Sequence, residues 1–478
     1  MPEKLYIDGA WREATGGGTI PVHAPDDGTV YAQLARGTEA DIEAAVTAAR
    51  RALDTTWRRT PAVERGRLLT RIARLIEANA EALAQSEARD CGKPMKQARA
   101  DIVAVARYFE FYGGAADKLH GEVIPYLDGW TVMVKREPRG VTGHIIPWNY
   151  PAQMFGRTLA PALAAGNACV LKPAEEACMT VLRLTELAHE VGCPPGVLNL
   201  VTGYGEEAGA ALAAHPGIDF LSFTGSPEVG TLVQKACADH HRPCTLELGG
   251  KSPQILFEDA DLDKALPVVT NAIIQNAGQT CSAGSRLLVQ RSLLDRLLPR
   301  LIARFDSLTC GPSYADRDCG PLISRTQQDR VRRFIDRAET DGIPLLAKAR
   351  IAEDAPPGGY YVAPRLYGPA PETHPLAREE VFGPVLTLLP FTDEADAVRL
   401  ANGTEFGLVA GIWTENGARQ LRVADALRCG QVFVNGYGAG AGIELPFGGV
   451  RRSGHGREKG MEALREFTTA KTIVINQG

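Results

Sequence analysis

The sequence predicts an α/β protein in which a Rossmann-like parallel sheet is followed by a second α/β unit. From residue 141, short apolar runs such as VTGHII, ACVLK and DFLSF alternate with stretches of helical periodicity. Strand–helix–strand alternation at this interval is typical of a parallel sheet with helical crossovers. The pattern resumes between residues 252 and 435. A chain of 478 residues fits about three domains at ~150 residues per domain.

Before the sheet, the chain is predicted to be mainly helical. Residues 38–53 carry apolar side chains at helical spacing, and Thr38 with Asp41 three positions later has the pattern of a capping box. Residues 63–83 and 102–119 repeat the helical periodicity. We therefore expect a group of helices to precede the strands of the first sheet.

Two strand-like segments lie outside this alternation. Residues 129–139 alternate apolar and polar side chains, and the tail TTAKTIVINQ has the composition of a strand. The first segment is predicted to be one strand of a hairpin, with the tail as its partner. Because exposed strand edges pair readily, this small sheet is either a local feature or a contact with another subunit.

The composition restricts the partners of this protein. Lys and Arg total 52 against 57 Asp and Glu, a net charge of −5, so the chain lacks the basic excess that nucleic acid binding requires. No apolar run approaches the ~20 residues of a membrane helix, and no secretory leader is expected. The ten cysteines form no CxxC pair, which predicts no metal site and reduced thiols in the cytoplasm.

One cysteine lies in a distinctive setting. Cys281 is surrounded by small residues in NAGQTCSAG, so a substrate can approach its sulfur and its backbone N–H can face a developing oxyanion. A small buried cysteine that packs as an apolar side chain is the alternative. The other nine cysteines lie in ordinary helix or strand patterns and are expected to be structural.

Glu247 and Asn149 occupy positions suited to catalysis. Glu247 ends the apolar strand CTLEL before a glycine pair, where burial would raise its pKa toward the range of a general base. An exposed glutamate at the end of a strand is the alternative. Asn149 lies between two prolines in PWNYP, so its amide is held where it can donate to an oxyanion, although turn chemistry alone also explains an Asn there.

The segment FTGSPEVG joins a strand to a helix in a way that favours anion binding. Ser226 is the expected N-cap, Pro227 the first helical residue, and Gly225 permits close approach of the backbone. Free N–H groups at such a helix start suit a pyrophosphate. The GxGxxG fingerprint is absent. Lys172, at the end of ACVLK, adds a cation at the carboxyl edge of the same sheet.

Taken together, these motifs resemble the aldehyde dehydrogenase family. PWN, LKP, FTGS, ELGGK, NAGQTC, EEVFGP and PFGGVRRSGHGRE follow one another in the order of that family, and the resemblance covers nearly the whole chain. It implies an NAD-binding domain of residues 1–120 and 140–249 and a catalytic domain of residues 250–449. Residues 121–139 and 450–478 would form an oligomerisation arm with a C-terminal strand, and homodimers or homotetramers are expected.

The resemblance also implies a mechanism. Cys281 would attack the aldehyde carbonyl to give a thiohemiacetal, with Asn149 and the backbone N–H of Cys281 as the oxyanion hole. After hydride transfer to the cofactor, Glu247 would activate the water that hydrolyses the thioester. An acylating, coenzyme A-dependent semialdehyde dehydrogenase is an alternative, although such members typically lack a glutamate at this place. A catalytically silent binding protein of the same fold is the other.

NAD is the cofactor that the resemblance implies. Lys172 and Glu175 match the positions that hold the adenosine ribose, and a carboxylate at position 175 favours NAD over NADP without excluding NADP. The other positions that match cofactor contacts are Ile145, Ile146, Trp148, Gly205, Gly209, Phe223, Gly225, Ser226, Val229, Leu248, Glu380 and Phe382.

The substrate side of the chain is individual. Arg157 stands where many family members carry Trp, and it suits a substrate carboxylate, as in the semialdehyde dehydrogenases that it resembles here. Members acting on aromatic aldehydes also carry Arg at this place, and a helix-surface arginine paired with a local acid is a further alternative. Gln275 replaces the second Arg of succinic semialdehyde enzymes. The small-residue loop 437–444 lacks the Trp of an aromatic box, which argues against betaine aldehyde.

Overall fold

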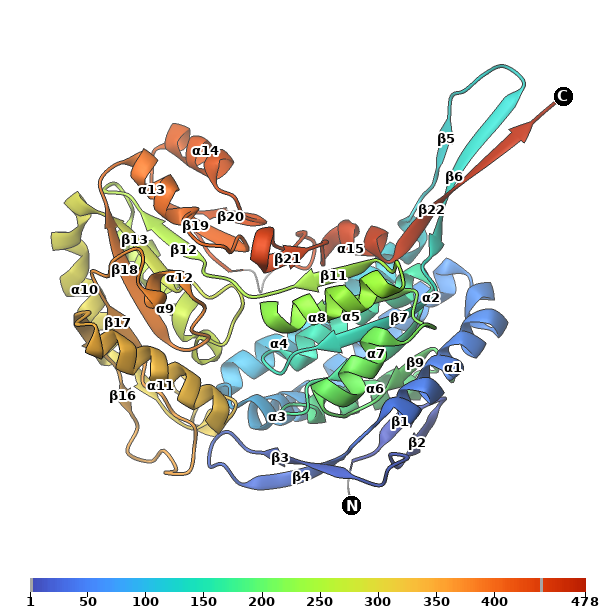
Figure 1. Cartoon of the computed structure of the whole chain (residues 1–478), viewed down its shortest axis with the longest axis horizontal. Helices are drawn as coiled ribbons and strands as arrows, with labels where there is room; N and C mark the ends of the chain where they lie inside the picture. The colour runs from blue at the N-terminus through green and yellow to red at the C-terminus, as the bar shows by residue number, and fades with distance from the viewer. Residues whose placement is uncertain (1–2, 439–441) are drawn as a thin grey trace.

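The computed structural model describes residues 3–438 and 442–478. Two large sheets lie beside each other, and a slender arm projects from the end that carries the first sheet (Figure 1). The predicted α/β class is confirmed by this arrangement. Residues 439–441 of the predicted substrate loop 437–444 lie outside the described residues.

The first sheet has the order β2-β1-β9-β8-β7-β10-β11-β21. Its five middle strands are parallel, whereas β1, β2 and β21 pair antiparallel at the two edges. The strands are β1 (Leu5–Ile7), β2 (Ala10–Arg12), β7 (Val141–Ile146), β8 (Ala168–Pro173), β9 (Leu198–Leu200), β10 (Phe220–Thr224), β11 (Cys244–Glu247) and β21 (Gly454–His455).

The second sheet has the order β15-β17-β18-β13-β12-β19-β20, and all its pairs are parallel except β15 with β17. Its strands are β12 (Pro253–Leu256), β13 (Arg286–Gln290), β15 (Leu345–Lys348), β17 (Arg365–Tyr367), β18 (Val385–Phe391), β19 (Val409–Trp413) and β20 (Gln431–Val434). Two separate strand pairs are β3 (Thr19–His23) with β4 (Val30–Ala35), and β14 (Thr309–Cys310) with β16 (Arg350–Ile351).

Helices cover both sheets. Those up to β11 are α1 (Glu39–Thr55), α2 (Ala62–Ala78), α3 (Ala80–Cys91), α4 (Met95–Ala115), α5 (Pro151–Ala165), α6 (Met179–Glu190), α7 (Ala210–Ala214) and α8 (Pro227–Asp239). Those that follow are α9 (Leu262–Ile274), α10 (Leu294–Ser307), α11 (Arg325–Thr340), α12 (Pro375–Arg378), α13 (Glu394–Ala401), α14 (Gly417–Ala426) and α15 (Gly460–Glu466). Helix α5 is buried along almost its whole length, between β7 and β8 on one side and α2 and α4 on the other.

The N-terminal part differs from the sequence prediction in two ways. The helix predicted over residues 63–83 is two helices, α2 and α3, separated at Asn79, whose side-chain Nδ2 donates to the Leu75 carbonyl at 2.8 Å. Residues 5–35 also form four short strands that the helical interpretation missed. The three-residue strands β1 and β2 are too short to show periodicity, and they are defined by pairing with each other and by the pairing of β1 with β9. The capping box at Thr38 and Asp41 is confirmed.

The strand order of the first sheet reverses between β7 and β10. The chain runs from β7 outward through β8 to β9 and then returns to the other side of β7 as β10. In open α/β sheets a ligand binds at the carboxyl ends of the strands where the order reverses. The register places Lys172, Ile145 and Phe223 in one row across β8, β7 and β10 at that edge. Topology therefore brings together residues that are distant in sequence.

The arm consists of β5 (Glu122–Ile124), β6 (Trp130–Pro138) and β22 (Thr468–Asn476). Strand β22 pairs antiparallel with β6 along nine residues, which confirms the predicted partnership of hairpin and tail. Both lie far from the sheets at the upper right of Figure 1. Residues 454–466 do not join the arm: β21 pairs with β11, and α15 packs against α5.

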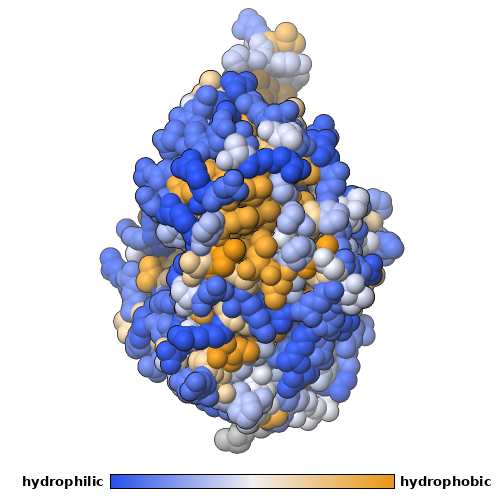
Figure 2. Space-filling model, turned by 90° about the vertical axis from the view of Figure 1, so that its left-hand side faces the viewer, coloured by the Kyte–Doolittle hydropathy of each residue, from blue (hydrophilic) through white to orange (hydrophobic). Residues whose placement is uncertain are grey.

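Figure 2 shows the surface of one side of the molecule. On the side that carries α10, α11 and α14 it is mostly hydrophilic, with apolar residues gathered near the centre (Figure 2). Within residues 3–438 and 442–478, no helix combines the length and apolar character needed to span a membrane. The same residues contain no group of three or more His, Cys, Asp or Glu side chains placed to hold a metal ion.

Candidate active site

A cavity of about 650 Å³ opens at the carboxyl ends of β7 and β10. Its lining comes from both α/β units, including Thr224 of β10 and Arg330 of α11, so the site lies between the two units. The predicted site residues that line it are Trp148, Asn149, Gly225, Ser226, Glu247, Cys281, Glu380 and Phe382. Tertiary structure thus gathers the three predicted catalytic residues and five of the predicted cofactor contacts in one space.

Cys281 follows a tight turn that needs left-handed backbone conformations. Asn276, Ala277 and Gly278 have φ values of 48°, 54° and 74°. A Cβ at Gly278 would overlap the backbone of Gly383, so this turn packs directly against the EEVFGP segment. Non-glycine residues in this region of φ carry strain that the surrounding structure must offset, and such strain is concentrated at active sites.

The thiol of Cys281 lies at the meeting point of two cavities. The second, of about 80 Å³, is lined by Cys281 together with Arg157, Gln275, Phe447 and Lys459, among others. Loss of hydration raises the pKa of the Cys281 thiol to about 12, while the guanidinium of Arg157 acts in the opposite direction. The Cys281 side chain is therefore shared by the linings of two cavities.

Glu247 is buried, which excludes the exposed-glutamate alternative. Its side chain is 2% exposed and lies at the end of β11, in register with Thr224 of β10. Burial raises the pKa of Glu247 well above its ordinary value, against the opposing charge of Arg157. A carboxyl group with a raised pKa inside the cavity is suited to exchange protons with a bound water molecule.

Arg157 is also buried, so the helix-surface alternative is wrong. It is 4% exposed on α5; its Nη2 lies 3.3 Å from Glu247 Oε2, and its Nε pairs with Glu458. The guanidinium stacks on Phe447 at 4.3 Å from the ring centroid. Burial alone would lower the pKa of Arg157, but Glu458 and Glu247 raise it above its ordinary value, so the side chain stays charged.

Hydrogen bonds hold both the side chain and the backbone carbonyl of Asn149. Its side-chain Nδ2 donates to the Gln279 carbonyl at 2.9 Å, and its own backbone carbonyl accepts from Lys93 Nζ at 3.0 Å and Asn276 Nδ2 at 2.8 Å. A side-chain amide carries two hydrogens. The Gln279 carbonyl accepts one of them, and Asn149 lines the larger cavity together with Cys281.

The predicted anion site has the expected local geometry. Ser226 caps α8, and its Oγ accepts from the backbone N–H of Val229 at 3.3 Å, with Pro227 as the first helical residue. A Cβ at Gly225 would come within 2.6 Å of Phe223. The first N–H groups of α8 face the cleft at the point where the strand order reverses, as a pyrophosphate site requires.

The predicted adenosine end lies at the carboxyl edge of β8. Lys172 Nζ and Glu175 Oε2 form an ion pair at 2.8 Å. Lys172 is buried, whereas the Glu175 side chain is about one-fifth exposed, at 22%. A Cβ at Gly209 would lie 3.9 Å from Lys172. Gly205 and Gly209 open and close the helical turn beside this pair, and Val229 is exposed on α8.

The opposite end of the cleft is formed by Glu380 and Phe382. Glu380 Oε1 accepts from the backbone N–H of Gly250 at 2.8 Å, and a Cβ at Gly249 would overlap its carboxylate. Burial raises the pKa of Glu380 to about 7. Phe382 meets Trp148 edge to face, with ring centroids 5.4 Å apart. Ile146 and Leu248 are buried nearby, and a Cβ at Gly230 of α8 would come within 2.6 Å of Leu248.

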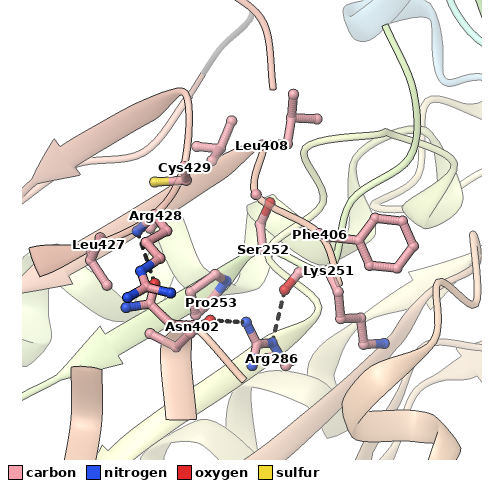
Figure 3. Close-up of a pocket in the computed structure, with 14 residues that line it drawn as sticks. Lys251, Ser252, Pro253, Arg286, Asn402, Phe406, Leu408, Leu427, Arg428 and Cys429 are labelled. Carbon is pink, nitrogen blue, oxygen red and sulfur yellow. Dashed lines mark hydrogen bonds between the residues drawn. The ribbon is translucent and has the colours of Figure 1, made fainter. Parts of the chain in front are cut away.

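The segment that carries Glu247 into the second sheet is clamped by Arg286 (Figure 3). The buried guanidinium donates to the carbonyls of Lys251, Leu400 and Ala401, each at 2.8 Å. A cavity of about 20 Å³, which Cys429 also lines, remains beside it. Because three carbonyls share one rigid donor, the crossover after Glu247 is held firmly between the two sheets.

Sequence reasoning missed several residues that the structure places at the site. Glu458, 3% exposed, is the second partner of Arg157, and its Oε1 accepts from Ser222 Oγ at 3.3 Å. Lys459 and Phe447 line the smaller cavity, and burial lowers the pKa of Lys459 to about 7. The motif PFGGVRRSGHGRE contained Phe447 and Glu458, but nothing in its spacing indicated their partners.

The comparisons with known proteins agree with this geometry. The model of the aldehyde dehydrogenase family matches residues 11–473. A hydroxyisobutyraldehyde dehydrogenase from Mycolicibacterium austroafricanum is 40% identical over 476 residues, which is 99% of this chain and 94% of that relative.

Two solved structures have the same fold. An aldehyde dehydrogenase candidate from Burkholderia cenocepacia is 61% identical with a TM-score of 0.99, over 99% of this chain and 100% of that one. PnpE from Pseudomonas sp. WBC-3, also solved in complex with nicotinamide adenine dinucleotide, is 41% identical with a TM-score of 0.97, over 100% of this chain and 98% of that one. The family and the fold expected from the motifs are thereby confirmed: this chain belongs to the aldehyde dehydrogenase family.

Proposed function

We propose that this protein oxidises an aldehyde to a carboxylic acid with NAD as the oxidant, through a thioester on Cys281. The observation that carries the proposal is the single cavity in which Cys281, Asn149 and Glu247 meet the start of α8 at the point where the strand order reverses. The complex of PnpE with nicotinamide adenine dinucleotide supports NAD as the cofactor.

Each step uses a group of this chain. The Cys281 thiol first releases its proton to water, and the thiolate sulfur then adds to the aldehyde carbon. The carbonyl oxygen becomes an oxyanion that accepts from Asn149 Nδ2 and the Cys281 backbone N–H. The bound cofactor would supply the acceptor for the hydride that leaves the tetrahedral carbon. Glu247 then removes a proton from water as that water attacks the thioester, and the Cys281 thiolate departs with release of the carboxylic acid.

Hydrolysis is favoured over transfer to coenzyme A because Glu247 is present and buried inside the cavity. The complete set of Cys281, Asn149 and Glu247 likewise favours an active enzyme over a silent binding protein. A panel of straight-chain, aromatic and carboxylate-bearing aldehydes, assayed by NADH absorbance with and without coenzyme A, tests both points. NADH formation without coenzyme A is expected; an absolute requirement for coenzyme A would overturn the hydrolytic assignment.

Glu175 is proposed to set the preference for NAD. A carboxylate there accepts from a free ribose 2′-hydroxyl and repels a 2′-phosphate. Glu175→Ala is therefore expected to lower the ratio of kcat/KM for NAD to kcat/KM for NADP by about tenfold. This factor corresponds to the loss of one charge-assisted hydrogen bond. Steady-state kinetics with both cofactors measure this ratio, with Glu190→Ala, a surface carboxylate paired with Arg183, as the control. An unchanged ratio would contradict the ribose role.

Arg157 is proposed to bind a carboxylate on the substrate. It lines the smaller cavity with Cys281, and the side chain of Lys459 lines the same cavity. Arg157→Met is expected to lower kcat/KM for a carboxylate-bearing aldehyde about 10- to 100-fold more than for a neutral aldehyde of equal length, since a hydrogen bond to a charged group contributes about 1.5–3 kcal/mol. Paired kinetics with the two aldehydes measure this difference.

The matched variant Arg157→Lys keeps the charge and should retain most of the discrimination. Arg157→Met is also expected to lose about 3–5 kcal/mol of unfolding free energy, because Glu247 and Glu458 would remain buried without a cation. Only the ratio between the two aldehydes therefore reports substrate binding. Equal losses for both substrates would refute the carboxylate role and leave Arg157 as a partner of the two glutamates.

The arm is proposed to mediate assembly into a dimer or tetramer. Its exposed apolar side chains, among them Val123, Tyr126, Leu127 and Val474, are 75%, 64%, 61% and 52% exposed. Contact with another subunit would remove these apolar side chains from water. It would also cover the exposed edges of the arm strands, which commonly pair with another chain. Sedimentation velocity is expected to show a species of at least twice the chain mass. A monomer at micromolar concentration would contradict this assignment.

The cytoplasm is the proposed compartment. All ten cysteines are free thiols, including pairs that are close in sequence such as Cys310 and Cys319. Reduced thiols in a chain of this length fit a reducing compartment.

A further inference from the structure

A buried ion cluster lies directly behind Asn149. Its centre is Lys93, in the turn between α3 and α4. Gly92 ends α3 in the left-handed conformation, with φ of 73°, and Pro94 precedes the first residue of α4. The turn directs the Lys93 side chain into the protein, where it is fully buried.

The ammonium group of Lys93 has three polar partners. Nζ donates to Glu87 Oε1 at 3.1 Å, to Asp101 Oδ2 at 2.5 Å and to the backbone carbonyl of Asn149 at 3.0 Å. It also lies 4.4 Å from the centroid of the Tyr150 ring. The two carboxylates are themselves buried, with side chains 0% and 3% exposed. The cluster therefore holds the peptide that joins Asn149 to Tyr150 from its carbonyl side.

The same carbonyl joins this cluster to the cysteine turn. Asn276 Nδ2 donates to it at 2.8 Å, and the backbone N–H of Asn276 donates to Gln97 of α4 at 2.8 Å. Asp101 extends the cluster in another direction: its Oδ1 accepts from Gln153 Nε2 at 2.6 Å, and Gln153 lines the smaller cavity. Lys93 and Asp101 thus connect Asn149, the turn before Cys281 and the substrate side.

Packing alone does not account for three charged side chains in this place. Apolar residues of similar volume often replace a buried ion cluster with no loss of stability or with a gain. An ammonium group held by two carboxylates does, however, restrict the position of a carbonyl more than an apolar contact would. The reason is that a charge-assisted hydrogen bond is both stronger and directional. The backbone carbonyl of Asn149 is the group that this cluster holds at the site.

We propose that Lys93 is a positioning residue for the oxyanion hole, acting through the backbone carbonyl of Asn149. With this carbonyl held, the Asn149 side chain directs its second amide hydrogen toward the oxygen of the aldehyde bound to Cys281. This inference rests on the proposed role of Asn149 in the reaction.

Lys93→Met tests the inference, since methionine is an unbranched side chain only one atom shorter and carries no charge. We expect kcat for aldehyde oxidation to fall about 30- to 100-fold, somewhat less than the 10²–10³ lost when an oxyanion donor is removed. The KM for NAD should change less than twofold. Hydrolysis of 4-nitrophenyl acetate should fall by a similar factor, because it too forms an oxyanion at Cys281. Alkylation of Cys281 by iodoacetamide forms no oxyanion, so its rate should stay within twofold of wild type.

Two further variants make the test specific. Lys96→Met is the matched control, since Lys96 lies three residues further on and is exposed; it should leave all four measurements unchanged. Lys93→Arg keeps the charge and should recover at least part of the lost kcat. If Lys93→Met does not fold, Asp101→Asn is the substitute, since it removes one negative charge beside Lys93 without changing the size of the side chain. In this variant kcat and the hydrolysis of 4-nitrophenyl acetate should fall about 3- to 10-fold, and the alkylation rate should not change.

The decisive comparison uses Asn149→Ala. Substitutions of residues that act as one unit have non-additive effects. Adding Lys93→Met to Asn149→Ala should therefore lower kcat by less than a further factor of two. Full multiplication of the two losses, or an equal fall in alkylation rate, would overturn the inference and leave Lys93 a structural residue. If Asn149→Ala itself retains full activity, the proposed oxyanion hole fails instead, so the two failures are distinguishable.

Discussion

Replacing Cys281 with serine is expected to abolish aldehyde-dependent NADH formation, with kcat reduced by about 10⁴ or more. A serine hydroxyl loses its proton far less readily than a thiol does. Removing a catalytic nucleophile can lower kcat by up to about 10⁶. Initial rates with a saturating aldehyde measure the loss. Circular dichroism should show an unchanged fold, because the two side chains differ by one atom.

The chain offers close controls for this variant. Besides Cys281, the cysteines that are not fully buried are Cys244 and Cys429. Cys244→Ser and Cys429→Ser are expected to keep activity within about twofold of wild type. Loss of activity in either variant, with retention in Cys281→Ser, would move the nucleophile elsewhere and refute the mechanism.

The pH dependence of Cys281 follows from the sign of its shift. Burial raises the pKa of the thiol to about 12, so at neutral pH the reactive thiolate is a minor species. At any pH below that pKa, the thiolate population increases about tenfold when the pH is raised by one unit. Alkylation of the free enzyme by iodoacetamide should therefore accelerate about tenfold per unit from pH 7 to 9. A plateau near pH 8 would show that the thiol ionises much more easily than its surroundings suggest.

Replacing Glu247 with glutamine is expected to separate the two halves of the reaction. Addition of Cys281 and hydride transfer do not need a base for water, so one NADH per site should still form in a rapid burst. Hydrolysis of the thioester should slow by about 10²–10⁴, the usual contribution of a positioned general base. Stopped-flow absorbance measures the burst, and steady-state assays measure the slow phase.

Hydroxylamine provides a chemical check on Glu247→Gln. It attacks thioesters without needing a protein base, so added hydroxylamine should restore part of the steady-state rate. Glu462→Gln, a surface carboxylate paired with Arg465, is the control and should behave as wild type. A variant that loses the burst together with the steady state would indicate that Glu247 is needed earlier, to activate Cys281 itself.

The sequence predicted the elements of the first sheet well because each had a local cause. The strands β7, β8, β9, β10 and β11 coincide with the apolar runs, and Ser226 caps α8 as its position before Pro227 indicated. The N-terminal strands β1 and β2 were missed because three-residue strands have no period. They pair with each other, and β1 joins the sheet by pairing with β9, a partner that lies almost 200 residues away in the chain.

The burial of the site residues depended on partners that the sequence does not place. Glu247 alone allowed an exposed or a buried reading, and Arg157 alone allowed a surface helix position. The structure buries both because β11, α5 and the segment before α15 converge, so that Arg157 lies between Glu247 and Glu458. A buried charge needs a compensating partner, and for Arg157 the partners are two carboxylates from distant segments, so this pairing is a property of the assembled chain.

The sequence by itself determined the family, the nucleophile candidate and the local turns, because these depend on residue types within a few positions of one another. Tertiary structure alone decided how the site is connected. It set the reversal of strand order between β7 and β10, the two cavities that meet at Cys281, and the hold of Lys93 on the Asn149 carbonyl. These features depend on strand order and on side chains meeting across long separations in sequence, which no local pattern encodes.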